Sequence, residues 1–219
     1  MRIIYGSEAP ASHDNEASQN SDRRAAPRVQ TIMRVGRAIS ENDHGLARVR
    51  NISDDGVRLR LQIPVMLDDA LTLELAEGVS LSGRVVWTDG DDCGLKFDRS
   101  IDCAALLADL AESAKQGTSR SLRLPVSISA VTRGENGIRL TQVSDISQRG
   151  MKLRNDGTFT EGLHVKVTLP SGLERRGVVR WSKDNFAGVM LTEPFSAEDL
   201  GSTRSLCDSI AKIEKESDY

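Results

Sequence analysis

Aromatic residues are scarce in this chain, at 4% of its 219 residues. A core with so few rings must be filled by Val, Leu and Ile side chains. Only three cysteines are present, Cys93, Cys103 and Cys207, and their odd number and irregular spacing exclude a disulfide framework and a zinc-binding pattern. No apolar run approaches the roughly 18 residues of a membrane-spanning helix, and the run at residues 1–6 is too short for a signal peptide. These absences predict a soluble, cytoplasmic protein with reduced thiols.

The chain also lacks the residue clusters of an enzyme or a metal centre. His13, His44 and His164 lie far apart in the sequence and have no metal-ligand spacing. No set of nucleophile, base and orienting residue is recognisable, and neither is a phosphate-binding loop. We therefore expect no catalytic residue, no metal and no cofactor, and we expect the three cysteines to be small core residues.

Positive charge is not in excess, since the formal net charge is -3 and the pI is about 5.7. This balance argues against a general nucleic-acid-binding protein. The charge is unevenly spread, however. Residues 20–60 hold nine Arg and five Asp/Glu, a balance of +4, whereas residues 61–119 hold four Lys/Arg and eleven Asp/Glu, a balance of -7. A local basic region on an acidic protein suits a small anionic ligand.

What the chain does contain is an internal repeat. Residues 51–56 (NISDDG) return 94 residues later as residues 145–150 (DISQRG). The same offset relates three further pairs of identical residues: Gly83 and Gly177, Trp87 and Trp181, Gly94 and Gly188. This period is too long for a solenoid repeat. It indicates two copies of one domain of about one hundred residues, a common domain size.

Each copy contains short segments in which apolar and polar residues alternate, as in half-buried strands. The predicted strands are 29–39, 46–52, 57–61, 71–75, 80–87 and 94–97, then 122–131, 138–144, 163–169, 177–181 and 188–191. Helices are predicted at 101–114 and at 196–215, the second with Ser196 and Asp199 as its capping pair. Trp87 and Trp181 are predicted to pack in the cores.

The fold class predicted from this pattern is mainly β. We expect two tandem six-stranded antiparallel barrels, each followed by a C-terminal helix. The domain limits expected are a disordered tail at 1–22, a first domain at 23–116 and a second at 117–219.

Two groups of side chains in the first copy suit a ligand that carries phosphates and guanine. Arg24 and Arg28, with Arg23 beside them, present guanidinium forks that match phosphate oxygens and the guanine O6 and N7 atoms. Pro27 disfavours a helix at the preceding residue, so this segment is expected to be an extended arm. Asn51 and Ser53 add hydrogen-bonding groups, and Gly56 allows a turn and close approach of a flat ligand.

Arg24-x-x-x-Arg28 followed by Asn51-x-Ser53-x-x-Gly56 resembles the paired signature of the PilZ domain family. The resemblance implies a six-stranded antiparallel barrel with a terminal helix, and a bacterial receptor for cyclic di-GMP. It implies that Arg24 and Arg28 grip guanines and phosphates, that Asn51 and Ser53 hydrogen-bond a guanine, and that Gly56 holds the turn. By the same resemblance, Arg23 occupies a place that influences whether one ligand or a stacked pair binds.

The second copy departs from this signature. Asp145, Ser147 and Gly150 match the second motif, and Arg123 matches the end of the first motif, but Ser119 stands where the other arginine is expected. Arg120 lies three residues before Arg123, which gives Arg-x-x-Arg. A lost bidentate contact is worth roughly 1–3 kcal/mol, or about tenfold to a hundredfold in affinity. The second copy is therefore expected to bind weakly or not at all, leaving one functional site per chain.

The function predicted is a cyclic di-GMP receptor whose first domain holds the ligand and whose output is contact with an unidentified protein partner. The alternative is a PilZ-like scaffold that docks a protein without nucleotide. That alternative requires the motif turns to be structural, since Asn, Asp and Ser side chains cap turns, and the arginines to be only solvated charges. A nucleic-acid-binding barrel is a third hypothesis, which the acidic pI disfavours.

Overall fold

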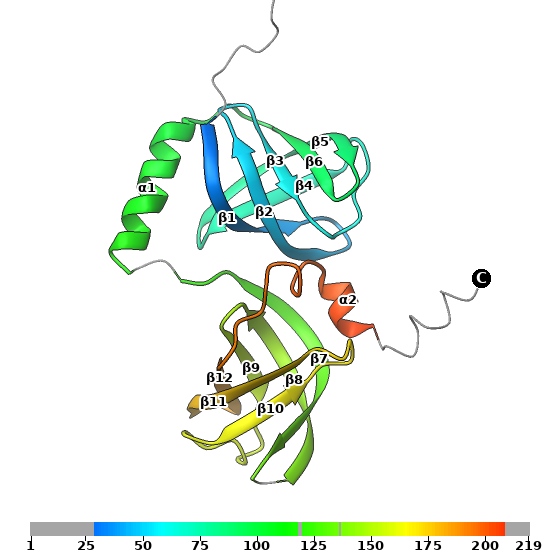
Figure 1. Cartoon of the computed structure of the whole chain (residues 1–219), viewed down its shortest axis with the longest axis vertical. Helices are drawn as coiled ribbons and strands as arrows, with labels where there is room; N and C mark the ends of the chain where they lie inside the picture. The colour runs from blue at the N-terminus through cyan, green and yellow to red at the C-terminus, as the bar shows by residue number, and fades with distance from the viewer. Residues whose placement is uncertain (1–28, 118–119, 136, 209–219) are drawn as a thin grey trace, which may run out of the picture.

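The computed structural model describes residues 29–117, 120–135 and 137–208, with side chains from Arg34 onward. The expected tail at 1–22 and the first-motif arginines Arg23, Arg24 and Arg28 lie outside the described residues. Figure 1 shows two β-barrels stacked along the long axis, with a short helix at the level where they meet. The predicted fold class is confirmed, because each barrel has six antiparallel strands.

Barrel 1 is closed by six strands in the spatial order β1-β2-β3-β6-β5-β4. Its strands are β1 (Val29–Ile39), β2 (His44–Ile52), β3 (Gly56–Arg60), β4 (Ala70–Ala76), β5 (Val79–Asp89) and β6 (Asp92–Phe97). Helix α1 (Cys103–Lys115) follows, and its first turn is capped by the Asp102 carboxylate, which accepts a hydrogen bond from the Ala105 amide.

Barrel 2 repeats this topology in the order β7-β8-β9-β12-β11-β10. Its strands are β7 (Arg123–Gly134), β8 (Gly137–Ser147), β9 (Gly150–Arg154), β10 (His164–Thr168), β11 (Glu174–Lys183) and β12 (Phe186–Leu191). Helix α2 (Thr203–Cys207) comes last among the described elements. The equal topology of the two barrels is what the sequence repeat predicted.

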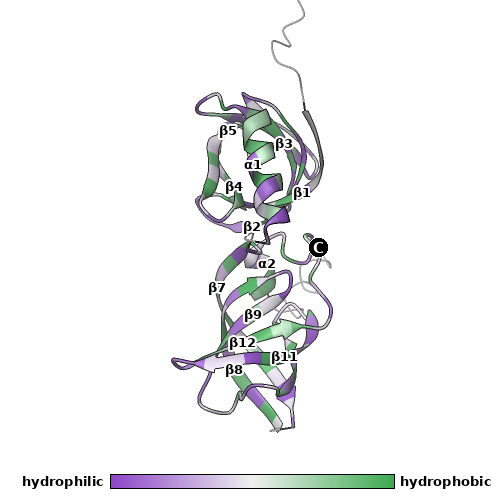
Figure 2. Cartoon of the chain, turned by 90° about the vertical axis from the view of Figure 1, so that its left-hand side faces the viewer, coloured by the Kyte–Doolittle hydropathy of each residue, from purple (hydrophilic) through white to green (hydrophobic). Residues whose placement is uncertain are grey.

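Alternating side chains explain why these segments form barrels. On β3, Val57 and Leu59 are buried while Arg58 and Arg60 face solvent, and Figure 2 shows the same mixture of hydrophobic and hydrophilic residues within single strands. Because successive side chains on a strand point to opposite faces, one face of each sheet fills the interior. The two cores consist mostly of Leu, Val, Ile and Ala side chains, with a few Phe, Cys and Met side chains among them.

The second helix differs from its prediction. Ser196 and Asp199 do exchange hydrogen bonds, each amide donating to the other's side chain at 2.9 Å, but they close a single turn. Helix α2 begins at Thr203 and is capped by Ser202, so the predicted start at residue 196 is wrong. The turn does not continue as a helix because its last carbonyl is bound by barrel 1. The carbonyl of Leu200 accepts a hydrogen bond from the Leu46 amide at 2.7 Å.

The two barrels are joined by a buried carboxylate. Asp43, in the loop between β1 and β2, is 5% exposed. Its carboxylate accepts hydrogen bonds from the Ser202 hydroxyl at 2.6 Å, the Thr203 hydroxyl at 2.8 Å and the Arg204 amide at 3.3 Å. A buried carboxylate needs such donors, since it would otherwise lose its hydration without replacement. We call this group of contacts the Asp43 contact.

Further contacts surround the Asp43 contact. Leu46 of barrel 1 belongs to the hydrophobic core cluster of barrel 2. Arg37 donates to the carbonyl of Arg123 at 2.7 Å, and the guanidinium of Arg48 forms a two-pronged pair with Glu198 at 2.5 and 2.8 Å. The barrels therefore meet through apolar, polar and charged contacts together.

The Arg48–Glu198 pair predicts a small pH dependence of stability. Hydrogen bonding from Arg48 lowers the pKa of Glu198 from 4.5 to about 2. A carboxyl whose folded pKa is lowered stabilises the fold above its unfolded pKa, and this stabilisation is lost as the pH falls from about 4.5 toward 2. Both side chains are partly exposed, so the contribution of this pair to the free energy of unfolding should be only about 0.2–1 kcal/mol.

In denaturant titrations, Glu198→Gln should be less stable than the parent at neutral pH. That difference should shrink by more than half near pH 3; a difference independent of pH would contradict this assignment.

Candidate functional site

The second motif of barrel 1 forms the hairpin between β2 and β3. The amide of Ser53 donates to the carbonyl of Gly56 at 2.8 Å, and the Ser53 hydroxyl donates to the same carbonyl at 3.2 Å. The next residue, Asp54, accepts a hydrogen bond from the Cys103 amide at the start of α1, at 3.0 Å. The motif is therefore tied both to its own turn and to the helix that follows the barrel.

Gly56 has a different structural role from the one expected. It is not among the residues with a positive φ, so the turn itself does not require glycine. A Cβ at this position would lie 2.6 Å from the carbonyl oxygen of Leu95 on β6. Glycine is needed because two strand backbones approach closely here.

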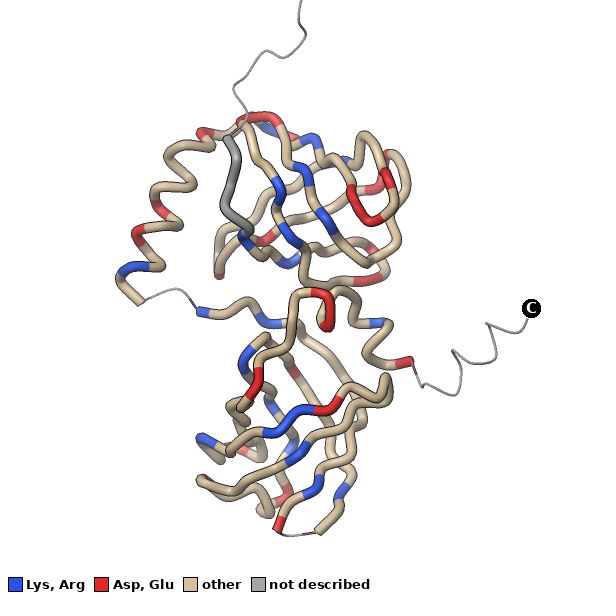
Figure 3. The backbone as a smooth tube through the Cα atoms, in the orientation of Figure 1, with Lys and Arg blue, Asp and Glu red and all other residues tan. Residues whose placement is uncertain are grey.

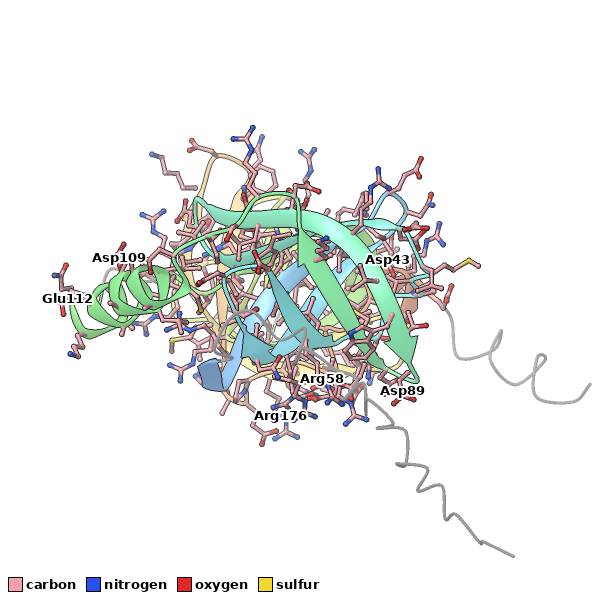
Figure 4. All side chains as sticks on the ribbon, turned by 90° about the horizontal axis from the view of Figure 1, so that it is seen from above. Asp43, Arg58, Asp89, Asp109, Glu112 and Arg176 are labelled. Atoms are coloured by element: carbon pink, nitrogen blue, oxygen red, sulfur yellow. The ribbon has the colours of Figure 1, made fainter. Side chains whose placement is uncertain are left out.

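Asn51, Ser53 and Gly56 are brought together in one surface pocket of about 440 Å³. The pocket is also lined by the basic Arg58 and Lys96, the acidic Asp55 and the aromatic Trp87. Figure 4, a view down the long axis, shows Arg58 projecting from the barrel on a different side from α1, which carries Asp109 and Glu112. Hydrogen-bonding groups, positive charge and an aromatic face thus share one place on barrel 1.

The expectation that the two tryptophans pack in the cores is wrong. Trp87 is 38% exposed and Trp181 is 41% exposed. Strict alternation from the buried Val85 would point Trp87 inward, but the strand register shifts between Val85 and Trp87. The equivalent shift separates Val179 from Trp181. A β-bulge inserts one residue and so turns the following side chain to the other face of the sheet.

Each indole lies flat on the barrel because the neighbouring strand has a glycine beneath it. A Cβ at Gly94 would lie 2.0 Å from Nε1 of Trp87, and a Cβ at Gly188 would lie 2.0 Å from Nε1 of Trp181. In barrel 1, the Arg58 guanidinium lies 5.7 Å from the centroid of the Trp87 ring and pairs with Asp92 at 2.7 Å. The repeated Trp and Gly therefore form an exposed aromatic surface on each barrel.

The strand register relates the first motif to this pocket. Val29, the first residue of β1, pairs with Ile52, and Gln30 pairs with Asn51. Arg28 directly precedes Val29 in the sequence. The chain that carries the first motif consequently joins the barrel beside the second motif.

In barrel 2, the structure brings three of the four predicted residues together. Arg123, Ser147 and Gly150 line a pocket of about 340 Å³ with Trp181. The fourth residue, Asp145, is outside this lining and accepts a hydrogen bond from Arg123 at 3.0 Å. Sequence reasoning missed Arg149 and Arg180, which line the same pocket.

Basic and acidic residues are interspersed on both barrels (Figure 3). On barrel 1, basic side chains on β3 have acidic partners: Arg58 pairs with Asp92, and Arg60 pairs with Asp91 at 3.4 Å.

The cysteine thiols give less information about the site. Cys93 and Cys103 are buried as expected, whereas Cys207 is exposed, and burial raises the pKa of Cys93 to about 11. No helix in the described ranges is long and apolar enough to cross a membrane.

Two closed barrels of equal topology, each with an Asx-x-Ser-x-x-Gly hairpin beside an exposed tryptophan, define a tandem β-barrel protein. The model of the PilZ domain matches residues 22–112 and again residues 118–207. The chain belongs to the PilZ domain family. No curated protein matches it.

Several solved structures are similar to this chain at low identity. PlzA of Borreliella burgdorferi, in complex with c-di-GMP, is 12% identical with a TM-score of 0.38, over 85% of this chain and 95% of that one. The inhibitor of motility MotI/DgrA of Bacillus subtilis is 14% identical with a TM-score of 0.30, over 86% and 100%. MrkH of K. pneumonia, in complex with c-di-GMP, is 11% identical with a TM-score of 0.29, over 84% and 87%.

Proposed function

We propose that this protein is a cyclic di-GMP receptor and that barrel 1 holds the ligand. The observation that carries this proposal is the register of β1 against β2, which starts at the Val29–Ile52 pair. It joins the Arg24-x-x-x-Arg28 segment to the barrel beside the pocket of Asn51 and Ser53. Membership of the PilZ domain family supports the same assignment.

The chemistry of the pocket suits a dianionic guanine dinucleotide. The forks of Arg24 and Arg28 would donate paired hydrogen bonds to phosphate oxygens or to the O6 and N7 atoms of guanine. The Ser53 hydroxyl already donates to the Gly56 carbonyl, so it offers its oxygen as an acceptor for a guanine N–H. The Asn51 amide supplies both donors and an acceptor, and the Arg58 guanidinium, which lies over the Trp87 ring, offers a planar cation on which a base can stack.

Signal output would come from ordering the arginine-bearing segment over the ligand. Fixing a segment of chain costs about 1–2 kcal/mol per residue, and charge-assisted hydrogen bonds to the phosphates offset this cost. The covered ligand and the ordered segment together would form a surface that the free protein lacks. A protein partner that recognises this surface would receive the signal without any catalytic step.

Titration calorimetry of the whole chain with cyclic di-GMP tests this function. We expect saturable heat at micromolar protein, and no comparable heat with GMP at the same concentration. Absence of heat with cyclic di-GMP would contradict the proposal and would favour the nucleotide-independent scaffold.

A further inference from the structure

We propose that two copies of this chain associate through the start of strand β8, by two-fold antiparallel pairing of residues 137–141. We call this segment the β8 edge; its central residues are Ile138, Arg139 and Leu140. It lies at the end of barrel 2 away from barrel 1 (Figure 1). None of these three residues lines the pocket of either motif hairpin, so the proposal does not depend on a ligand.

The equivalent hairpin of barrel 1 is the one that docks on barrel 2. Its Leu46 is 3% exposed and belongs to the core cluster of barrel 2. The Leu46 amide donates to the carbonyl of Leu200 at 2.7 Å, and the His44 amide donates to the carboxylate of Asp43 at 2.8 Å. Both amides therefore point away from β1, toward the edge of β2 that barrel 2 covers.

Barrel 2 repeats this hairpin without such a cover. The repeat offset places Ile138 where barrel 1 has His44, and Leu140 where it has Leu46. The two hairpins also share one strand register at these positions. In barrel 2, however, the side chain of Ile138 is 69% exposed and that of Leu140 is 78% exposed. A position that is buried at the contact between the barrels thus has an exposed apolar counterpart.

The backbone of β8 is open along the same residues. Among the described residues, β9 pairs with β8 only from Val143 onward, so residues 137–141 have β7 on one side and no strand on the other. By equivalence with barrel 1, the amides of Ile138 and Leu140 point to this open side. An unpaired edge that carries large apolar side chains is a site for the addition of another strand.

A second copy of the β8 edge is a strand that fits. Antiparallel pairing about a two-fold axis at Arg139 places Ile138 opposite the second copy's Leu140, and Leu140 opposite its Ile138. Because the amides of these residues face the open side, the opposed residues can exchange backbone hydrogen bonds. Residues two apart on a strand share one face, so the four apolar side chains form one cluster and cover one another.

Charges near the axis complement each other in this arrangement. Arg139 lies 3.9 Å from Asp156. The repeat offset places Asp156 where barrel 1 has Gln62, and the Gln62 side chain lies against Gly201 of the docked segment. Asp156 is therefore expected beside the added strand. Two arginines and two aspartates then surround the axis, and their attraction offsets the repulsion between the opposed Arg139 side chains.

Sedimentation equilibrium of the whole chain without nucleotide tests the association, over about 5 to 500 µM protein. The pairing is short, so it should be weak. We expect the mean mass to rise with concentration from the 23.9 kDa of one chain toward twice that value. Leu140→Lys places a charge on the edge and should weaken the association by at least about tenfold.

Met66→Lys is the matched control, because Met66 is an apolar side chain of barrel 1 that is 75% exposed. It should associate as the parent does, and circular dichroism checks that both variants are folded. The proposal is overturned if the parent keeps the mass of one chain up to about 500 µM, or if Leu140→Lys associates as tightly as the parent.

Cysteine cross-linking tests the register of the pairing. Cys207→Ser first removes the exposed thiol. In that background, Arg139→Cys places two thiols opposite each other across the axis, at a Cβ separation close to that of a disulfide. We expect a cross-linked dimer under mild oxidation. Arg133→Cys, at an exposed position on β7, should remain monomeric, and cross-linking of Arg133→Cys as fast as that of Arg139→Cys would rule out this register.

Discussion

Arg28→Ala is expected to abolish cyclic di-GMP binding by barrel 1, with a loss of about a hundredfold or more in affinity. Arg28 stands one residue before β1, whose first residue pairs with Ile52 of the second motif. Removing its fork deletes a bidentate, charge-assisted contact and leaves a ligand group without its donor. Calorimetric titration measures the loss. Thermal unfolding without ligand should stay nearly unchanged, because we assign Arg28 to the ligand and not to the fold.

Two further variants sharpen this test. Arg28→Lys keeps the positive charge but loses the planar fork, so it should bind more weakly than the parent and more tightly than Arg28→Ala. Arg99→Ala removes an exposed arginine of the same domain that does not line the pocket and should bind as the parent does. Equal affinity of Arg28→Ala and the parent would refute the assignment of barrel 1.

Asp43→Ala is expected to separate the two barrels and to lower the free energy of unfolding by about 3 kcal/mol or more. The substitution leaves the hydroxyls of Ser202 and Thr203 and the Arg204 amide without their acceptor. The His44 amide also loses its acceptor, but the β1–β2 loop itself should persist, because the hydroxyl and the amide of Ser40 both donate to the backbone carbonyl of Asp43. Denaturant titration should show a lower midpoint, and X-ray scattering should show a larger maximum dimension.

Asp43→Asn and Asp109→Ala are the controls for this result. Asparagine keeps one acceptor oxygen but turns an amide donor toward a hydroxyl or an amide, so its effect should be intermediate. Asp109 is exposed on α1, and its removal should change stability by no more than about 0.5 kcal/mol. If Asp43→Ala had the unfolding midpoint and scattering of the parent, the Asp43 contact would not be what holds the barrels together.

Most strands were predictable because burial of one sheet face imposes a period of two on the sequence, but β9 (Gly150–Arg154) was not among the predicted strands. β1 was predicted with the bounds that the structure has, and the alternation of Leu71 and Leu73 located β4. The second helix was not predictable in the same way. The capping pair of Ser196 and Asp199 forms as expected, but a cap favours a helix without compelling it, and contact of Leu200 with barrel 1 ends the turn.

The candidate site was predicted in part. Asn51, Ser53 and Gly56 do share a pocket, because a motif within one hairpin stays together in any fold that keeps the hairpin. Trp87 was predicted to pack in the core because apolar, β-favouring residues surround it in the sequence, but a bulge turns it outward. Arg149 and Arg180 were missed, although comparing the two copies position by position would have shown arginines where barrel 1 has Asp55 and Val86.

The amino-acid sequence alone determined that the molecule has two like barrels and determined the order of their motifs, because repeats and periodicity are local properties of a chain. Only the tertiary structure decided which way Trp87 and Trp181 face and how the barrels meet. A bulge depends on how two strands pair, and the bond from Ser202 to Asp43 joins residues 159 positions apart. No local pattern records such a contact, since it exists only once both barrels have folded.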